Sequence, residues 1–279
     1  MTGRGGEPIE TPSAGSGRQM LSVVHIESEP MTKLRFFNAK RGGGREIASL
    51  DVSQATVECL PADLDALVAA ADLQGIIPDT EAGGVSLLLG VAVAETLEEM
   101  ASEGLVPPCS RTGVLLAGDL FSVPEANRRG GYGDVSAVWR AFSDRFAFVA
   151  GVAGNHDDVR KVRGANQYVL DMEVRALHGI RIGGVGLIGG NPAKPGRRAE
   201  NEQLEHIDLL TSEPLDVLVV HEGPKGEDGQ LGHPRIAELV VARGVPLTIC
   251  GHVHWREPLW RHPRGQVLNV DGRVVVLTR

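Results

Sequence analysis

The feature that most constrains this chain is a set of short apolar runs that each stop abruptly at polar residues. Apolar runs of this length predict strands that are buried on both faces. A polar group at the end of such a strand lies at the rim of the sheet, where open α/β folds bind their ligands. The clearest runs, each with the polar residues that follow it, are residues 114–119, 148–157, 217–221 and 247–254.

Length and pattern indicate one large domain. The 279 residues suffice for a sizeable core. We expect residues 1–18, rich in Gly and Ser, to form a disordered tail and residues 19–279 to form a single domain. Within it, we expect 19–63 to form an N-terminal strand extension and 64–279 to form the core. Alternating strand and helix patterns, followed by further strands, predict an α/β sandwich with antiparallel additions.

The expected helices and strands follow from apolar spacing and from turn residues. Residues 41–45, with three consecutive glycines, predict a hairpin turn rather than a nucleotide-binding loop, because no helical pattern follows. Helices are expected at 85–102, 135–142, 201–210 and 236–242. Strands are expected at 21–26, 34–37, 64–71 and 180–188, with two or three more between 258 and 277.

The amino-acid composition argues against some classes of binding partner. The net charge of −8 argues against a broad surface that coats nucleic acid, although a local basic groove is compatible with it. Aromatic residues make up only 4%, which argues against an extended base-stacking platform. The three cysteines form no C-x-x-C pair, and neither a signal peptide nor a membrane-spanning run is visible. We therefore expect a cytoplasmic protein without a membrane partner.

The polar residues at the strand ends are of metal-ligand types. Carboxylate, amide and imidazole donors suit Mn²⁺, Fe or Zn²⁺ bound for catalysis rather than a closed structural zinc site. Six candidates exceed the needs of one ion, and two ions about 3.5–4 Å apart can clamp a phosphate. His156 then remains free as a general acid toward the leaving oxygen. The six candidate ligands are Asp72, Asp119, Asn155, His221, His252 and His254.

In order and spacing, these residues resemble the calcineurin-like metallophosphoesterase family over roughly residues 65–279. The resemblance implies a four-layered αββα sandwich of two mixed sheets flanked by helices. It also implies hydrolysis of phosphoester bonds by a hydroxide that bridges two divalent transition-metal ions, with Mn²⁺ preferred and Fe or Zn²⁺ as alternatives. The catalytic residues it implies are His156 and Asp157.

The resemblance also assigns the ligands to the two ions. Asp119 would bridge both of them. One ion would be held by Asn155, His221 and His252, and the other by Asp72 and His254.

One motif departs from the family pattern. Where the family has Asp-x-His, this chain has Asp72-Leu73-Gln74. An amide oxygen is a weaker ligand than imidazole, so Gln74 either binds the second ion loosely or orients a water on it. The second motif reads Gly-Asp-Leu-Phe-Ser, without the second Asp of the family's protein phosphatases, which argues against that class.

Candidate substrate-binding residues lie outside the motifs. Arg128 and Arg129 sit in a glycine-rich loop, either as a solvated basic turn or as phosphate contacts at the pocket rim. Asn191, after two glycines, is a comparable candidate for the pocket lining.

The sequence thus favours a metal-dependent phosphoesterase. The missing second-motif Asp favours phosphodiesters, such as nucleotides or nucleic-acid ends, with a phosphomonoesterase as the alternative. A degenerate member that serves as a binding scaffold is a third interpretation, motivated by Gln74 alone.

Overall fold

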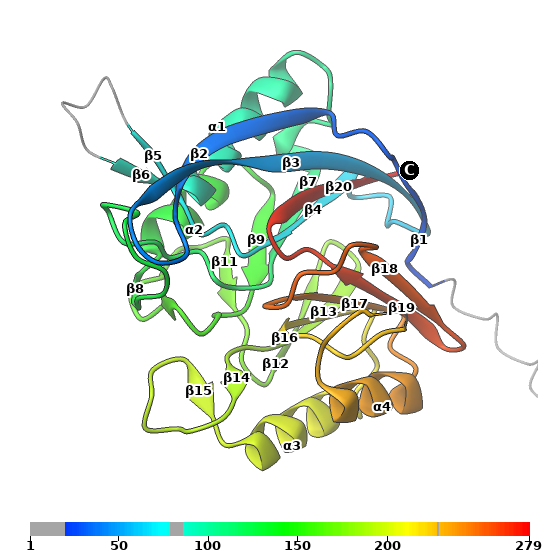
Figure 1. Ribbon diagram of the computed structural model, residues 1–279. Helices are drawn as coiled ribbons and strands as arrows, with labels where there is room; N and C mark the ends of the chain where they lie inside the picture. Colours follow the sequence, from blue (N-terminus) through cyan, green and yellow to red (C-terminus); the bar gives the residue numbers. More distant parts are fainter. Residues whose placement is uncertain (1–19, 79–85, 228) are drawn as a thin grey trace, which may run out of the picture.

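The fold rests on two β-sheets that pack face to face (Figure 1). The computed structural model describes residues 20–78, 86–227 and 229–279, so the predicted tail at 1–18 and Val85 lie outside the described residues. The larger sheet has ten strands in the order β11-β9-β7-β4-β20-β3-β2-β5-β6, with β1 paired to β3. They are β1 (Ser22–Ile26), β2 (Thr32–Ala39), β3 (Arg45–Glu58), β4 (Ala66–Ala71), β5 (Ile76–Pro78), β6 (Ser86–Leu88), β7 (Thr112–Leu116), β9 (Phe148–Gly151), β11 (Gln167–Val169) and β20 (Arg273–Thr278).

The second sheet has six strands in the order β12-β13-β16-β17-β19-β18. They are β12 (Glu173–Leu177), β13 (Ile180–Val185), β16 (Val217–Glu222), β17 (Leu247–Gly251), β18 (Leu259–His262) and β19 (Gly265–Asn269). Two short ribbons complete the strands. They pair β8 (Gly133–Asp134) with β10 (Asp157–Asp158), and β14 (Ile188–Gly189) with β15 (Arg197–Arg198).

Strand β4 is buried on both faces, so its side chains contribute to two apolar clusters. Every residue of β4 is buried, and successive side chains point to opposite faces. Leu67, Ala69 and Ala71 face the apolar cluster between the two sheets, which also contains Val219 and Ile249 of the second sheet. The alternate residues of β4 join a different cluster, on the outer face of the large sheet.

Helices cover the outer faces of both sheets (Figure 1). Helix α1 (Leu89–Ser102) buries Val93, Leu97 and Met100 at helical spacing against the large sheet, together with α2 (Ser136–Ser143). Helices α3 (Glu200–Leu210) and α4 (Pro234–Arg243) pack on the second sheet. A single 3₁₀ turn spans Cys109–Arg111.

The expected mixed α/β class is confirmed, and the helices lie at the four predicted places. Two boundaries differ from the predicted ones by more than two residues. Helix α1 begins only at Leu89, because the residues before it pair as β6 with β5. The strand predicted at 180–188 divides into β13 and β14, with Leu187 in the left-handed region at φ 66° between them. Among the described residues, no helix is long and apolar enough to cross a membrane.

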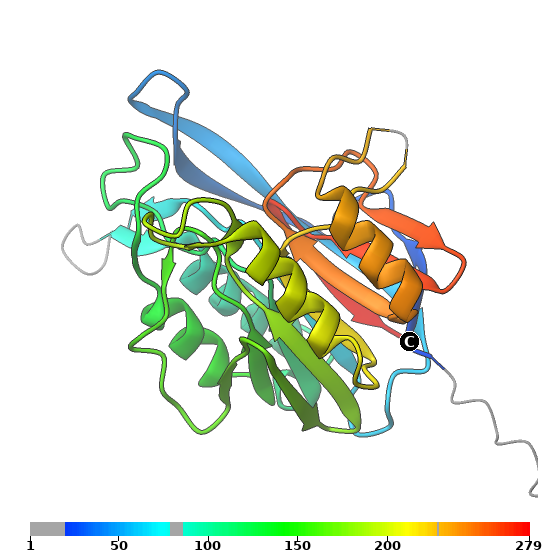
Figure 2. The ribbon, with the colours of Figure 1, turned by 90° about the horizontal axis from the view of Figure 1, so that it is seen from below.

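The N-terminal extension is joined to the core through the C-terminal strand. Strand β20 lies between β4 and β3, antiparallel to the first and parallel to the second. Strands β2 and β3 form a hairpin that reaches beyond the other strands of the sheet (Figure 2). Strand β3, the longest of the sheet, lies within the predicted extension but was not predicted as a separate strand.

Gln266 links the extension to the second sheet and generates a stability prediction. Its side chain, 8% exposed, accepts a hydrogen bond from the Val23 N–H at 2.7 Å and donates to the Val23 carbonyl at 3.0 Å. Gln266→Leu leaves both backbone groups buried without this partner. We expect the free energy of unfolding to fall by about 1–3 kcal/mol, measured by urea denaturation.

The control is Gln54→Leu, the same change at a partly buried position whose side chain donates one hydrogen bond, to Thr278. It should cost less. Equal losses for the two variants would contradict the special role of Gln266.

Candidate metal centre

Three of the predicted ligands follow neighbouring strands of the large sheet. Strands β4, β7 and β9 are parallel and adjacent, so their carboxyl ends meet at one edge. Asp72, Asp119 and Asn155 come after these three ends. This is the position at which α/β sheets bind ligands.

The second sheet supplies two imidazoles. Strands β16 and β17 are parallel neighbours, and their pairing shifts register between Val220 and Glu222. The shift is a bulge at His221, and bulges re-aim side chains. His252 follows the end of β17 directly.

Hydrogen bonds join the two sheets through these same residues. The backbone N–H of His252 donates to Asp72 Oδ2 at 2.9 Å. His221 Nδ1 lies 2.8 Å from the Ala117 carbonyl oxygen, to which it donates. In its neutral form, with the proton on Nδ1, His221 would present an unprotonated Nε2 to the site, the form in which imidazole binds a metal.

The backbone at the site is held in a sparsely populated conformation. Asp72, Asp119 and His252 have φ values of 53°, 56° and 71°. Residues other than glycine adopt this left-handed region at a cost of about 1–3 kcal/mol each, and such strain gathers at functional sites. Two glycines make room for the carboxylates: a Cβ at Gly154 would collide with Asp119, and one at Gly251 with Asp72.

A compact ligand cluster results. Asp119, His221 and His252 each offer a ligand atom, and these atoms lie within 4.8 Å of one another. Asp119 and His221 are buried, and His221 Nε2 lies 3.4 Å from Asp119 Oδ1. Asn155 Oδ1 is 3.2 Å from the same nitrogen, which places a fourth donor beside the cluster. One carboxylate, one amide and two imidazoles are a donor set that suits a divalent transition metal.

Burial and charge act strongly on these groups. Burial raises the pKa of Asp72 well above its usual range. Burial also acts to raise the pKa of Asp119, but the neighbouring His221 outweighs it, and the pKa lies below the usual value. Burial opposes protonation of His221, yet Asp119 raises its pKa to about 10. Burial, reinforced by His221, lowers the pKa of His252 to about 4. The buried carboxylates thus create a field that favours a cation between them and the imidazoles.

His156 lies over the bridging carboxylate. The backbone N–H of His156 donates to Asp119 Oδ1 at 2.9 Å, and the ring Nδ1 is 2.5 Å from the Gly131 carbonyl oxygen. That carbonyl requires a proton on Nδ1, so Nε2 faces Asp119 Oδ2, at 3.8 Å. A group that donates a proton to a leaving oxygen must lie next to the metal cluster, and His156 Nε2 lies at such a position.

Asp157 has a different setting. It is 1% exposed, and its carboxylate accepts hydrogen bonds from the N–H groups of Leu120, Phe121 and Gly154 at 2.7–3.1 Å. Burial raises its pKa to about 6. These contacts make Asp157 a positioning residue that holds the second and third motifs together. The catalytic role expected for it stays a prediction.

The other half of the predicted site is less closely assembled. Gln74 Nε2 donates to Asp119 Oδ2 at 3.4 Å, so this side chain does face the bridging carboxylate. His254 is largely exposed; its Nδ1 lies 3.2 Å from the Asp271 carbonyl oxygen and its Nε2 3.1 Å from an Arg273 guanidinium nitrogen. The ligand roles of Asp72, Gln74 and His254 stay predictions.

A cavity of about 420 Å³ opens over the cluster, and both candidate arginines line it. Arg129 donates from Nε to the Ala39 carbonyl at 3.1 Å, whereas Arg128 makes no ion pair with another described residue. Asn191 is exposed, and its Oδ1 accepts from the Ala193 N–H at 3.0 Å in a local turn. The substrate-binding roles of these three residues stay predictions.

Several residues at the site were not identified from the sequence. Asp271 lines the cavity and contacts His254 through Oδ1 at 3.5 Å. The positive charge of Arg197 contributes to the lowered pKa of His252. Phe36 and Asn38 of β2 also line the cavity. Asp271-Gly272 is typical of a turn in the sequence, and only the pairing of β20 with β4 brings it beside Asp72.

Fold and cluster together present a candidate metal centre at the shared edge of the two sheets. The family model of the calcineurin-like phosphoesterases matches residues 72–256. The chain therefore belongs to the calcineurin-like phosphoesterase family, whose members usually bind divalent metals and hydrolyse phosphoesters.

One solved structure supports the fold. The chain is similar to TT1561 of Thermus thermophilus, with a TM-score of 0.50 and 16% identity over 75% of this chain and 89% of that chain. AQ665 from Aquifex aeolicus, a protein of unknown function, has 15% identity over 76% of this chain and 95% of that chain. Its TM-score of 0.34 carries no weight for the fold. No curated protein sequence matches significantly.

The cluster generates a prediction for metal binding. His252→Ala removes one of the three closest ligand groups, so the affinity for Mn²⁺ should fall at least about 100-fold, beyond the 10–100-fold typical of residues that only support a ligand. Isothermal titration calorimetry on the metal-stripped protein measures it.

His25→Ala is the matched control, because that ring is 63% exposed and pairs only with Glu27. It should bind Mn²⁺ like the parent protein. Equal affinities of His252→Ala and the parent would remove His252 from the ligand set.

Proposed function

We propose that this protein hydrolyses phosphodiesters of the nucleotide or nucleic-acid type and depends on two divalent metal ions, preferentially Mn²⁺. The observation that carries the proposal is the convergence of Asp119, His221 and His252 within 4.8 Å, with His156 beside them at the floor of one cavity. Buried imidazoles and carboxylates gathered in this way serve no evident packing purpose. A scaffold protein would not require them.

The proposed ligand sets are those that the resemblance to the family implies, and the cluster of Asp119, His221 and His252 supports the first of them. Asn155, His221 and His252 would hold one ion, Asp72 and His254 the other, aided by Gln74, and Asp119 would bridge both. When bound, such ions neutralise charge on the phosphate oxygens and lower the pKa of water toward neutrality.

The chain's own residues orient and protonate the substrate. The Gly131 carbonyl keeps a proton on His156 Nδ1 and leaves Nε2 facing the cluster. In the protonated ring, the Nε2 proton can pass to the oxygen of the departing alcohol. Arg128 and Arg129, which line the cavity, offer forked donors to a phosphate.

The lining of the cavity supports a diester over a small monoester. The lining includes the apolar side chains Phe36 and Phe121. A phosphate alone makes no use of such side chains, whereas a base or sugar attached through a diester would bury apolar area against them. A phosphomonoesterase remains the alternative.

Fold and location complete the proposal. Three apolar clusters, one between the sheets and one under each helix pair, support the four-layered αββα sandwich. The cysteines Cys59, Cys109 and Cys250 are all free, which supports a reducing, cytoplasmic setting. We expect a soluble phosphoester or a nucleic acid as partner.

The activity is tested on metal-stripped protein reloaded with Mn²⁺ and given aryl phosphodiester and phosphomonoester substrates. We expect turnover, with the diester preferred. His156→Ala should lower kcat about 10²–10⁴-fold because the proton donor is lost. Mn²⁺ stoichiometry, measured on the same samples, should stay at the parent value.

His25→Ala is again the control and should retain the parent kcat. Absence of turnover with Mn²⁺, Fe²⁺ and Zn²⁺ would reject the hydrolase. A higher kcat/KM on the monoester would favour the alternative.

Gln74 generates a separate prediction. Gln74→His restores the imidazole that the family pattern has, so the weaker of two Mn²⁺ sites should bind at least about 10-fold more tightly in calorimetric titration, since imidazole is the stronger donor. Gln54→His, the same change far from the cluster, should leave both sites as they are. Unchanged stoichiometry and affinity in Gln74→His would show that position 74 faces no ion.

A further inference from the structure

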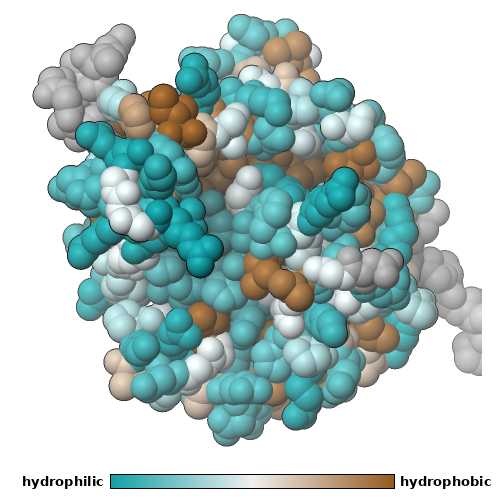
Figure 3. Space-filling model, viewed as in Figure 1, coloured by the Kyte–Doolittle hydropathy of each residue, from teal (hydrophilic) through white to brown (hydrophobic). Residues whose placement is uncertain are grey.

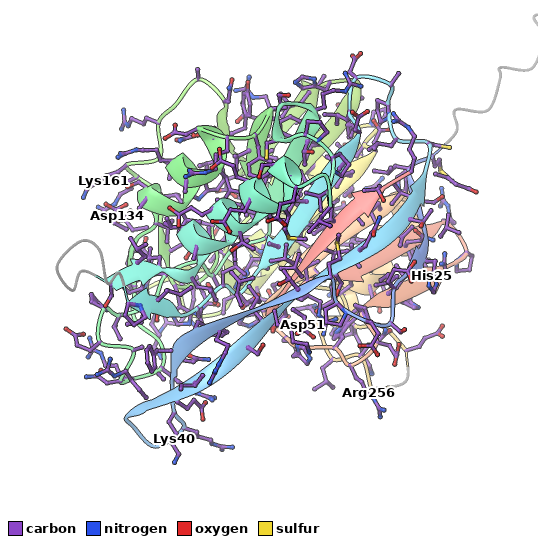
Figure 4. The ribbon with its side chains drawn as sticks, turned by 90° about the horizontal axis from the view of Figure 1, so that it is seen from above. His25, Lys40, Asp51, Asp134, Lys161 and Arg256 are labelled. Carbon is purple, nitrogen blue, oxygen red and sulfur yellow. The ribbon has the colours of Figure 1, made fainter. Side chains whose placement is uncertain are left out.

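The β2–β3 hairpin lies outside the stretch that matches the family model, 72–256. Its two strands pair in continuous antiparallel register from Thr32↔Val52 to Ala39↔Arg45. The turn is closed by two backbone hydrogen bonds between Lys40 and the glycines that follow it. Figure 4 shows Lys40 at the free end of this hairpin, away from the body of the sheet. The hairpin is therefore an ordered arm that lies outside the matched domain.

The arm is docked on the loop that leads to β8. The Gly44 N–H donates to the Asn127 carbonyl at 3.0 Å, and Arg129 Nε donates to the Ala39 carbonyl at 3.1 Å. The same loop carries the Gly131 carbonyl that orients His156. Arm, loop and proton donor are thus linked by direct hydrogen bonds, and the arm stands at a set position beside the cavity.

Cations gather where the arm and the loop meet. Lys40, Arg41 and Arg45 are exposed around the turn, and Arg128 and Arg129 line the cavity below. Figure 3 shows strongly hydrophilic side chains collected at the left of the view, over the region where β2, β3 and β8 meet in Figure 1.

These cations are poorly neutralised. Arg129 lies 3.8 Å from Glu46, while among the described residues the side chains of Lys40, Arg41 and Arg128 take part in no ion pair. The whole chain carries −8, so a local excess of positive charge here runs against its average. A surface of this kind attracts a polyanion.

Two aromatic rings line the same cavity as Arg128, Arg129 and the metal cluster. Phe36 packs so closely on Gly75 that a Cβ there would collide with the ring, and Phe121 packs in the same way on Gly133. Both rings line the cavity and are held in place by backbone. Fixed rings at the mouth of a cationic surface suit the stacking of an unpaired base.

We propose that the β2–β3 hairpin and the loop before β8 form a binding surface for single-stranded nucleic acid and deliver a phosphodiester near its end to the metal centre. This inference rests on the proposed function and names its substrate class. The tip cations contact phosphates several nucleotides from the reacting one. Phe36 and Phe121 hold the base next to it.

Other polyanions fit the observed surface less well. A mononucleotide that fills the cavity leaves the tip of the arm without a contact. A duplex keeps its bases stacked inside, where rings in a cavity do not reach them. A membrane surface would use the cations but not the aromatic cavity.

The test uses Lys40→Glu/Arg41→Glu/Arg45→Glu in the full chain. The matched control is Arg140→Glu/Lys225→Glu/Arg235→Glu, which alters net charge equally at exposed positions on other elements. Binding of a fluorescent single-stranded oligonucleotide is measured by anisotropy in the Mn²⁺-loaded His156→Ala background over a salt series. Circular dichroism confirms that each variant is folded.

We expect the hairpin variant to raise Kd at least about 10-fold and to reduce the salt slope of log K by about 2, for three lost phosphate contacts. In the catalytically intact background, its kcat/KM for the oligonucleotide relative to bis(4-nitrophenyl) phosphate should fall by a similar factor. The control should match the parent in both.

Equal oligonucleotide binding by parent and hairpin variant would overturn the inference. So would a parent that prefers mononucleotides, duplex or anionic vesicles over the single strand. Failure of the proposed function has a different signature, because the parent would then hydrolyse neither the small diester nor the oligonucleotide. In that case the anisotropy data still decide whether the hairpin binds nucleic acid.

Discussion

The structure depends on the hydrogen bonds that close the seam between the two sheets. The His252 N–H meets Asp72, and His221 meets the Ala117 carbonyl, so each sheet completes the other at its carboxyl edge. The same side chains are the candidate metal ligands. The contact between the sheets and the candidate metal site are therefore formed by the same residues, and neither sheet alone contains the whole site.

That coupling explains the strain at the site. Asp72, Asp119 and His252 hold left-handed backbone angles at a cost of about 1–3 kcal/mol each. The apolar cluster between the sheets fixes the strands that carry them. Gly154 and Gly251 give the carboxylates space that no larger residue would leave. Burial raises the pKa of Asp72, whereas the Asp119 carboxylate, against the effect of burial, raises the pKa of His221 to about 10.

The extension before residue 72 contributes to the lining of the cavity. Strand β20 pairs with both β3 and β4, and Phe36 and Asn38 of β2 line the cavity. Asp271, which follows residue 256, lines it as well. The cavity is therefore lined by residues from both sides of the stretch that matches the family model, as well as from within it.

Much of the fold and site could be predicted from local pattern. Helix spacing located α1 to α4, and the buried runs located β4, β7, β9, β16 and β17 with the polar groups that end them. Strand β3 was not predicted, although Leu50, Val52 and Val57 are buried within it, because the polar residues of the strand obscure its apolar pattern. Asp271 was not identified because Asp271-Gly272 resembles an ordinary turn, and Arg197 because it lies in the two-residue strand β15, which no sequence pattern predicts.

By itself, the sequence determined which polar residues follow which strands. Strands buried on both faces appear as continuous apolar runs, and these can be recognised without knowledge of the tertiary structure. Only the tertiary structure decided which of these polar residues meet. The bulge at His221, the seam between the sheets and the docking of the hairpin on the 127–132 loop depend on contacts between residues far apart in the chain. Those contacts brought Asp119, His221 and His252 together, turned His254 toward Asp271, and placed Phe36 at the cavity.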